Sequence, residues 1–394
     1  MAEVSAGGVT SAGTPSPALV DAAPLPNEVS PRRVRRALIR LVALVVIAVV
    51  AVTLVPGLGS LRERFAHARA VWIAIACAFE VLSALSYVPA FRVVFCNRMS
   101  WRTSYKIAMA EEAADSVLPV GGAGGLALGA WALGRGGMPA AEIARKTVAF
   151  FLLTSVPNVA TLGLVGIGLA TGALPGHASL VLTIVPAAVA IAAIAATLAL
   201  GRLARRIEAQ MRGQSRRFRL ARVAPALLAA ADGVDEALKQ LRRATPLLLL
   251  GLFGYMVFDI LTLWASFRAL GSTPQLPIIW IAYVIGQLGN LVPLPGGIGG
   301  VELGLIGALV LYGLPAVIAT AAVLVYRVIE LWIPAALGAV AFVQLRIMLR
   351  REAHEIDLCR PGETVQIIGR GPVVASSPPT IPIAQRAPRG SLDR

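Results

Sequence analysis

The chain has 394 residues, of which 57% are hydrophobic and only 14% are charged, with a formal net charge of +15. A soluble domain carries about 25% charged and about 45–50% apolar residues, so this composition excludes a soluble enzyme, a disordered chain and a coiled coil. It is typical of a protein that crosses a membrane several times. Basic residues of membrane proteins collect on the cytoplasmic side, which explains the charge without a nucleic-acid partner.

Residues 1–37 are predicted to form a disordered cytoplasmic tail. Ala, Gly, Ser and Pro dominate its first part without a periodic pattern. A basic cluster, formed by Arg32, Arg33, Arg35 and Arg36, directly precedes the first apolar run. A secretory signal would instead place its basic residues ahead of a short apolar stretch near the start. We therefore interpret the cluster as a cytoplasmic anchor for the first helix.

The membrane domain is predicted over residues 38–343. A helix needs about 20 apolar residues to cross a bilayer. Six segments satisfy this length, and we expect each to be a full span: 38–56, 71–91, 147–171, 179–200, 246–270 and 317–343.

Two further apolar segments, 105–134 and 277–312, are interrupted in the middle by glycines. Both interruptions contain the pattern Gly-Gly-x-Gly-Gly, and the two patterns lie 175 residues apart. Farther on, Gly137-Met138-Pro139-Ala140 matches Gly313-Leu314-Pro315-Ala316, and a long span follows each match. We infer an internal repeat of span, broken segment and span, with copies at about 71–171 and 246–343.

The distribution of charge predicts the topology. The tail before the first span, the stretches 92–106 and 135–146, the loop 201–245 and the tail 344–394 are basic, whereas 172–178, 271–277 and 313–316 carry no Lys or Arg. If each broken segment enters and leaves on the same side, every basic region is cytoplasmic and every uncharged connection is external. We therefore predict an all-α polytopic protein with six full spans, two re-entrant helical hairpins, an inverted-topology repeat and both termini in the cytoplasm.

The two breaks are the predicted substrate-binding region. Backbone that is broken inside a bilayer must be buried in protein or line a polar cavity. Half-helices are expected to start near Leu126 and Val301, and their amide N–H groups favour an anion such as a lipid phosphate. Glycine allows a headgroup to approach the backbone, although it also serves close helix packing. The candidate residues at the breaks are Gly121, Gly122, Gly124, Gly125, Pro295, Gly296, Gly297 and Gly299.

Charged residues within apolar segments are costly and therefore informative. Glu302 falls in the first turn of the second half-helix, where it either caps the helix or contributes to the site. Arg327 and Glu330 are three residues apart and can pair, yet a guanidinium is also well shaped to hold a phosphate. We include these three residues in the predicted site. The other such residues are Glu80, Asp259, Glu111, Glu112 and Asp115, of which the last three are expected to be solvated near the cytoplasmic mouth.

No catalytic motif appears, and neither a metal site nor a cofactor is predicted. The run from Leu291 to Glu302, followed by Gly313 and by Tyr326-Arg327, resembles the lysylphosphatidylglycerol synthase transmembrane-region family. That resemblance covers about 71–343 and implies lipid translocation between leaflets. Synthase members carry a large soluble catalytic domain after the membrane region. Residues 344–394 are only a polar tail, so lipid aminoacylation is not expected.

These observations favour a flippase for a phospholipid or a lipid-linked glycan in the bacterial cytoplasmic membrane. Its lipid substrate is expected to have an anionic headgroup. A membrane-embedded transferase and a non-transporting scaffold are the alternatives. In the scaffold alternative, the basic loop 201–245 binds a partner or anionic lipid.

Overall fold

The computed structural model describes residues 59–117, 123–175, 220–291 and 297–351, together with single positions between 36 and 43 and between 181 and 206. Within these ranges every regular element is a helix, which confirms the predicted all-helical class. The domain boundaries at 37 and 343 stay predictions, and most of both tails lies outside the described residues.

Four of the described helices are long and apolar enough to cross a membrane. They correspond to four of the six predicted spans, whereas the spans predicted at 38–56 and 179–200 fall largely outside the described residues. Each long helix is an almost uninterrupted apolar run, because a backbone surrounded by lipid must satisfy its own hydrogen bonds. These helices are α4 (Ala70–Phe95), α7 (Ala140–Ala170), α10 (Pro246–Ala269) and α13 (Ala316–Arg351).

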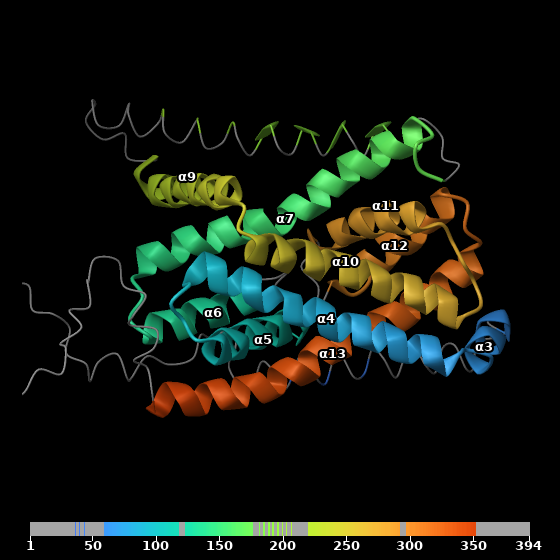
Figure 1. Ribbon diagram of the computed structural model, residues 1–394, viewed down its shortest axis with the longest axis horizontal. Coiled ribbons are helices and arrows are strands. Elements are labelled where there is room, and N and C mark those ends of the chain that lie inside the picture. The colour runs from blue at the N-terminus through green and yellow to red at the C-terminus, as the bar shows by residue number, and fades with distance from the viewer. Residues whose placement is uncertain are drawn as a thin grey trace, which may run out of the picture. The chain divides into compact units, whose positions relative to one another are not determined.

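Both interrupted segments consist of two short helices separated by the glycine-rich break. In the first, α5 (Trp101–Val117) precedes α6 (Ala123–Arg135). In the second, α11 (Leu276–Gln287) and a 3-10 turn (Leu288–Leu291) precede α12 (Gly300–Leu311). Figure 1 shows α5 and α6 packed at one end of the long helices, and α11 and α12 at the other.

The returning half-helix of each pair packs closely on the entering one. A Cβ atom at Gly125 would lie 2.6 Å from the backbone oxygen of Glu111, and one at Gly300 would lie 2.6 Å from that of Gly289. The two glycines are 175 residues apart, so they occupy equivalent positions in the two predicted copies of the repeat. Only glycine allows this approach without displacing backbone.

The two half-helices α6 and α12 also end in the same turn. Gly137 and Gly313 both have φ of +90°. The next amide donates five residues back in each case, from Met138 to the Leu133 oxygen and from Leu314 to the Leu309 oxygen. Proline follows each turn, and α7 and α13 then begin. This geometry is a glycine-based helix C-cap, in which a positive φ is needed to end the helix.

Helices α4 and α10 form an antiparallel pair at the centre. The Arg69 amide donates to the Ala269 oxygen at 2.8 Å, and Ser83 Oγ donates to the Tyr255 oxygen at 2.9 Å. Near the other end, Gly251 lies directly against Ala90. Small residues allow the two backbones to approach, which supplies the van der Waals packing that holds helices together in lipid.

Apolar side chains form two main clusters, one toward each end of this central pair. One surrounds Phe91, Phe95 and Phe150 and includes residues of α5, α6 and the end of α13. The other surrounds Phe267 and Tyr326 and includes residues of α11, α12 and the beginning of α13.

The basic region 201–245, which we predicted as a loop, contains an amphipathic helix, α9 (Leu220–Arg243). Ala231, Val234 and Ala237 are buried along one side of it. Gly233 lies against Val148 of α7. The basic residues make this stretch too polar to be predicted as a membrane span. They are compatible with an amphipathic helix, because such a helix needs apolar residues along only one side.

Candidate functional site

Arg327 of α13 is the centre of a buried ion-pair group that joins two helices. Its Nε lies 2.8 Å from Glu302 Oε1 of α12, and its Nη1 lies 2.5 Å from Glu330 Oε2. The residue Arg327 is only 4% exposed. Pairing with two carboxylates offsets the cost of placing a cation in an apolar environment. The three charged residues predicted for the site therefore lie together.

Glu302 caps its helix, which is one of the two roles that its position suggested, and it also pairs with Arg327. Its Oε2 accepts the Gly299 amide proton at 2.6 Å, while its Oε1 pairs with Arg327. Gly299 has φ of +90°, a conformation that L side chains rarely adopt. Glu302 thus caps the first turn of α12 and attaches that turn to α13.

The first break has a carboxylate in the corresponding place. Asp115 Oδ1 accepts the Gly125 amide proton at 2.7 Å. At both breaks, an amide that we expected to be available to an anion instead donates to an acidic side chain of the same chain. The half-helix starts are therefore already supplied with negative charge.

Glu111 is buried, which overturns our expectation that it would be solvated. It is 1% exposed, and its Oε2 accepts a hydrogen bond from the Tyr87 hydroxyl at 3.1 Å. Glu112 and Asp115 are partly buried. The expectation failed because it placed these residues at the mouth of the hairpin, whereas they follow ten or more helical residues from Trp101. At about 1.5 Å per residue, that distance reaches well into a bilayer.

Two further buried carboxylates, Glu80 of α4 and Asp259 of α10, lie near the Glu302–Arg327–Glu330 group. Asp259 Oδ2 accepts a hydrogen bond from the Tyr283 hydroxyl at 2.6 Å. Glu80 interacts electrostatically with Asp259, Glu112 and Glu330. The sequence marked both as charges within apolar runs, but their proximity depends on the packing of α4 against α10.

The glycine-rich candidates are only partly within the described residues. Gly124 and Gly125 lie in the first turn of α6, which begins at Ala123 rather than near Leu126. Gly297 has φ of +65° and is buried. Gly121, Gly122, Pro295 and Gly296 lie outside the described residues.

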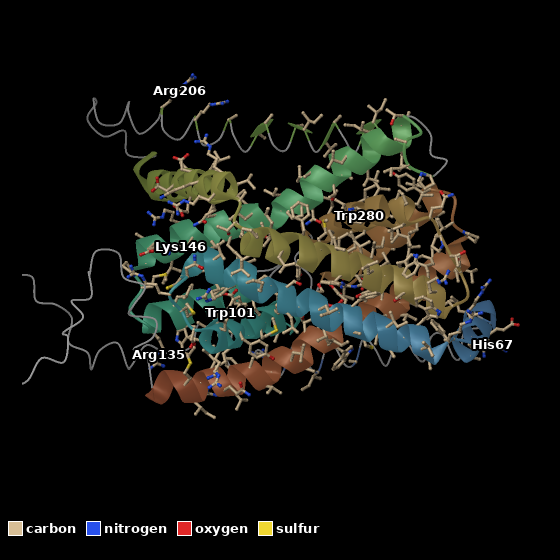
Figure 2. All side chains as sticks on the ribbon, viewed as in Figure 1. His67, Trp101, Arg135, Lys146, Arg206 and Trp280 are labelled. Carbon is tan, nitrogen blue, oxygen red and sulfur yellow. The ribbon has the colours of Figure 1, made fainter. Side chains whose placement is uncertain are left out.

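A groove at the basic end of the molecule is suited to an acyl chain and a charged headgroup. Its volume is about 460 Å³, and α4, α5 and α13 form its walls. Leu85, Val88 and Pro89 supply apolar surface, while Arg102 and Lys106 supply positive charge. In Figure 2, Trp101, Arg135 and Lys146 lie near this end and His67 lies near the opposite end.

A second cavity, of about 600 Å³, lies beside α9. Its lining is mainly basic, with one acidic residue: Arg202, Lys239, Arg242, Arg243 and Asp235, with Val234 and Leu238. Positive charge beside an amphipathic helix is typical of contact with anionic lipid.

Comparison with known proteins identifies the family. Residues 40–338 match the family described as "Lysylphosphatidylglycerol synthase TM region". The chain belongs to this family. The match includes α4, α7 and α10, the part of α13 up to residue 338, both broken segments and the Glu302–Arg327–Glu330 group, so these features lie within the family's region of similarity.

A curated relative is also described as a membrane protein. The chain is 34% identical over 85 residues to a UPF0104 membrane protein of Methanothermobacter thermautotrophicus, and the match covers 21% of this chain and 25% of the relative. The aligned part thus spans about a quarter of the relative's length. No solved structure matches the chain. The protein is therefore an integral membrane protein of the lysylphosphatidylglycerol synthase transmembrane-region family.

Proposed function

We propose that the protein moves a phospholipid or a lipid-linked glycan between the leaflets of the bacterial cytoplasmic membrane. The observation that carries this proposal is the placement of charge: two broken helical segments, one at each end of the central helices, adjoin a buried group of carboxylates around Arg327. A buried polar region beside broken backbone is where a headgroup can leave water while its acyl chains stay in lipid.

An inverted-topology repeat of six full spans and two re-entrant hairpins would supply the alternating access. The equivalent glycine contacts at Gly125 and Gly300 support the repeat, as do the identical turns at Gly137 and Gly313. Because the hairpins enter from opposite ends, rocking of one copy against the other would open the polar region to each leaflet in turn.

We propose an anionic headgroup and a two-stage path for it. Arg102 and Lys106 in the groove receive the phosphate at the cytoplasmic end. The glycine-rich breaks and Arg327 then hold it at mid-depth, where the phosphate replaces one of the two carboxylates that Arg327 contacts. A planar guanidinium is suited to such an exchange, because it presents several donors in one fork.

Reconstitution of the purified full chain tests this proposal. Liposomes would contain fluorescent phospholipids, or in parallel a labelled polyprenyl phosphate, with a membrane-impermeant quencher added outside. We expect protein-containing liposomes to expose inner-leaflet label faster than protein-free ones. Movement equal to the protein-free rate for every lipid would contradict a flippase and favour the scaffold. A new covalent lipid product on chromatography would favour the transferase.

A further inference from the structure

Glu80 and Asp259 occupy matching depths on the paired helices α4 and α10. The Arg69–Ala269 hydrogen bond aligns the start of α4 with the end of α10. Each carboxylate lies ten residues from that end, because α4 starts at Ala70 and α10 ends at Ala269. At 1.5 Å per residue this is about 15 Å, which is half of a hydrocarbon core of about 30 Å.

Each of these carboxylates is buried and has one oxygen without a hydrogen-bond partner. Glu80 is 3% exposed and Asp259 is 4% exposed. Among the described residues, nothing donates to Glu80 Oε2 or to Asp259 Oδ1. The hydroxyl of Tyr326, which is fully buried, faces Asp259 without reaching hydrogen-bond geometry. This hydroxyl is thus directed at Asp259 and also lacks a hydrogen-bond partner.

The surrounding groups leave this region with excess negative charge. Among the described residues, Arg327 is the cation that interacts with Asp259, and it already contacts Glu302 and Glu330. Glu112 of α5 and Glu330 of α13 add negative charge near Glu80. The remaining polar groups around the pair are Thr262, Tyr255, Tyr283 and Tyr326. Unpaired negative charges at this depth are strongly unfavourable, so the region needs a bound cation.

We propose that Glu80 and Asp259 together bind one exchangeable proton. A proton needs a single carboxylate oxygen, and each residue offers one that has no partner. A metal cation such as Ca²⁺ takes about six to eight oxygen ligands. When the proton binds, one carboxylate becomes a carboxylic acid whose O–H can donate to the other carboxylate or to the Tyr326 hydroxyl. When it leaves, it returns to water on the side to which the region is open.

The proton also links this site to Arg327. Protonation removes one negative charge from the neighbourhood of the guanidinium, so an added phosphate would meet less repulsion. Lipid movement would then respond to a pH gradient across the membrane. This coupling rests on the proposed function, whereas the proton site itself does not.

Infrared difference spectroscopy of the full chain in lipid nanodiscs tests the site without any lipid substrate. A protonated buried carboxyl gives a C=O stretching band that shifts in D2O. We expect the wild type to show this band with a reversible dependence on pH. The double variant Glu80→Gln and Asp259→Asn should lose it, while Glu63→Gln, at an exposed position in α3 (Gly59–Ala66), should retain it.

Wild-type spectra alone can overturn the proposal, so the test does not depend on whether the variants fold. Absence of the band at every pH would overturn it, and so would a band that persists unchanged in a folded double variant. Na⁺ or K⁺ binding measured by calorimetry, and lost in the double variant, would replace the proton with a metal cation.

A transport assay with an imposed pH gradient separates this proposal from the flippase proposal. We expect the gradient to accelerate lipid movement in the wild type and in Glu63→Gln, but not in the double variant. If no protein moves lipid while the infrared band responds as expected, the proton site stands and the flippase proposal fails. If lipid moves and the band is absent, the flippase proposal stands and the proton site fails.

Discussion

The chemistry of this protein depends on a few charges in an apolar environment. A lone charge at the centre of a bilayer costs about 2.5–3.5 kcal/mol on insertion scales. Arg327 offsets that cost by pairing with Glu302 and Glu330. The Glu302–Arg327 pair connects α12 to α13, whereas the binding of a substrate phosphate by the guanidinium is a separate role that needs its own test.

A paired substitution separates the two roles of Arg327. We expect Arg327→Leu combined with Glu330→Leu to insert normally, because replacing a buried ion pair by apolar residues is often neutral. Glu302 retains the Gly299 amide as a partner. If Arg327 holds a phosphate, the double variant should not move lipid, and Arg327→Lys should be partly active because it keeps the charge without the planar fork.

The quenching assay on reconstituted protein measures this difference, with size-exclusion chromatography to establish folding. The exposed Glu63→Gln serves as the matched control. Full transport by the double variant would remove Arg327 from the binding site and leave it a structural role.

Gly297 and Gly307 allow a second comparison at the scale of single residues. Gly297 is buried with φ of +65°, whereas a Cβ at Gly307 would meet nothing within 4 Å. We expect Gly297→Leu to reduce lipid movement much more than Gly307→Leu, since a side chain at the break demands an unfavourable φ. Transport rates at matched reconstitution would show this, and equal losses would mean that the break is not special.

At the scale of helices, close packing of small residues decides which elements pair. A Cβ at Gly251 of α10 would lie 2.7 Å from the Ala90 amide of α4, and Gly254 faces Ser86 in the same interface. Helices in lipid gain little from hydrophobic burial, so such contacts contribute most of the association. The same pairing sets Glu80 beside Asp259.

We therefore expect Gly251→Ile to destabilise the protein. Overpacking of a tight contact costs about 1–3 kcal/mol in well-packed cores. Gly163→Ile in α7 is the control, because a Cβ atom added at Gly163 would meet nothing within 4 Å. Thermal unfolding in detergent should show a lower midpoint for Gly251→Ile only. A similar decrease in both variants would point to helix propensity instead of packing.

At the scale of the whole molecule, the asymmetry of charge predicts the orientation in the membrane. The groove with Arg102 and Lys106 lies at the end where α4 leads into α5, whereas the connection between α10 and α11 carries no Lys or Arg. The positive-inside rule therefore predicts that the groove faces the cytoplasm. With six full spans and two re-entrant hairpins, both termini are then expected on the cytoplasmic side.

Cysteine labelling of intact cells tests this orientation. In a chain whose three native cysteines are replaced by Ser, an impermeant maleimide should label Ala173→Cys and Thr273→Cys, which are exposed positions between helices. It should label Ser215→Cys and Ser376→Cys only after permeabilisation. External labelling at 376 would contradict the two-hairpin topology, since an odd number of crossings would then separate the termini.

Local features of the chain were predictable from the sequence. The four long described helices, the two breaks and the shared turn at Gly137 and Gly313 each depend on residues that are close in the chain. Hydropathy and the backbone freedom of glycine also depend only on residues that are close in the chain. The Arg327–Glu330 pair belongs to this class too, because i and i+3 always lie on one face of a helix.

The tertiary structure decided which distant charges meet. Glu302 lies 25 residues before Arg327, and Glu80 and Asp259 are on the different helices α4 and α10. The burial of Glu111 and the helical nature of residues 220–243 also escaped prediction. Helix packing brings these partners together through the shapes of small residues along whole interfaces. The spacing of residues within a single segment does not show which distant residues will meet.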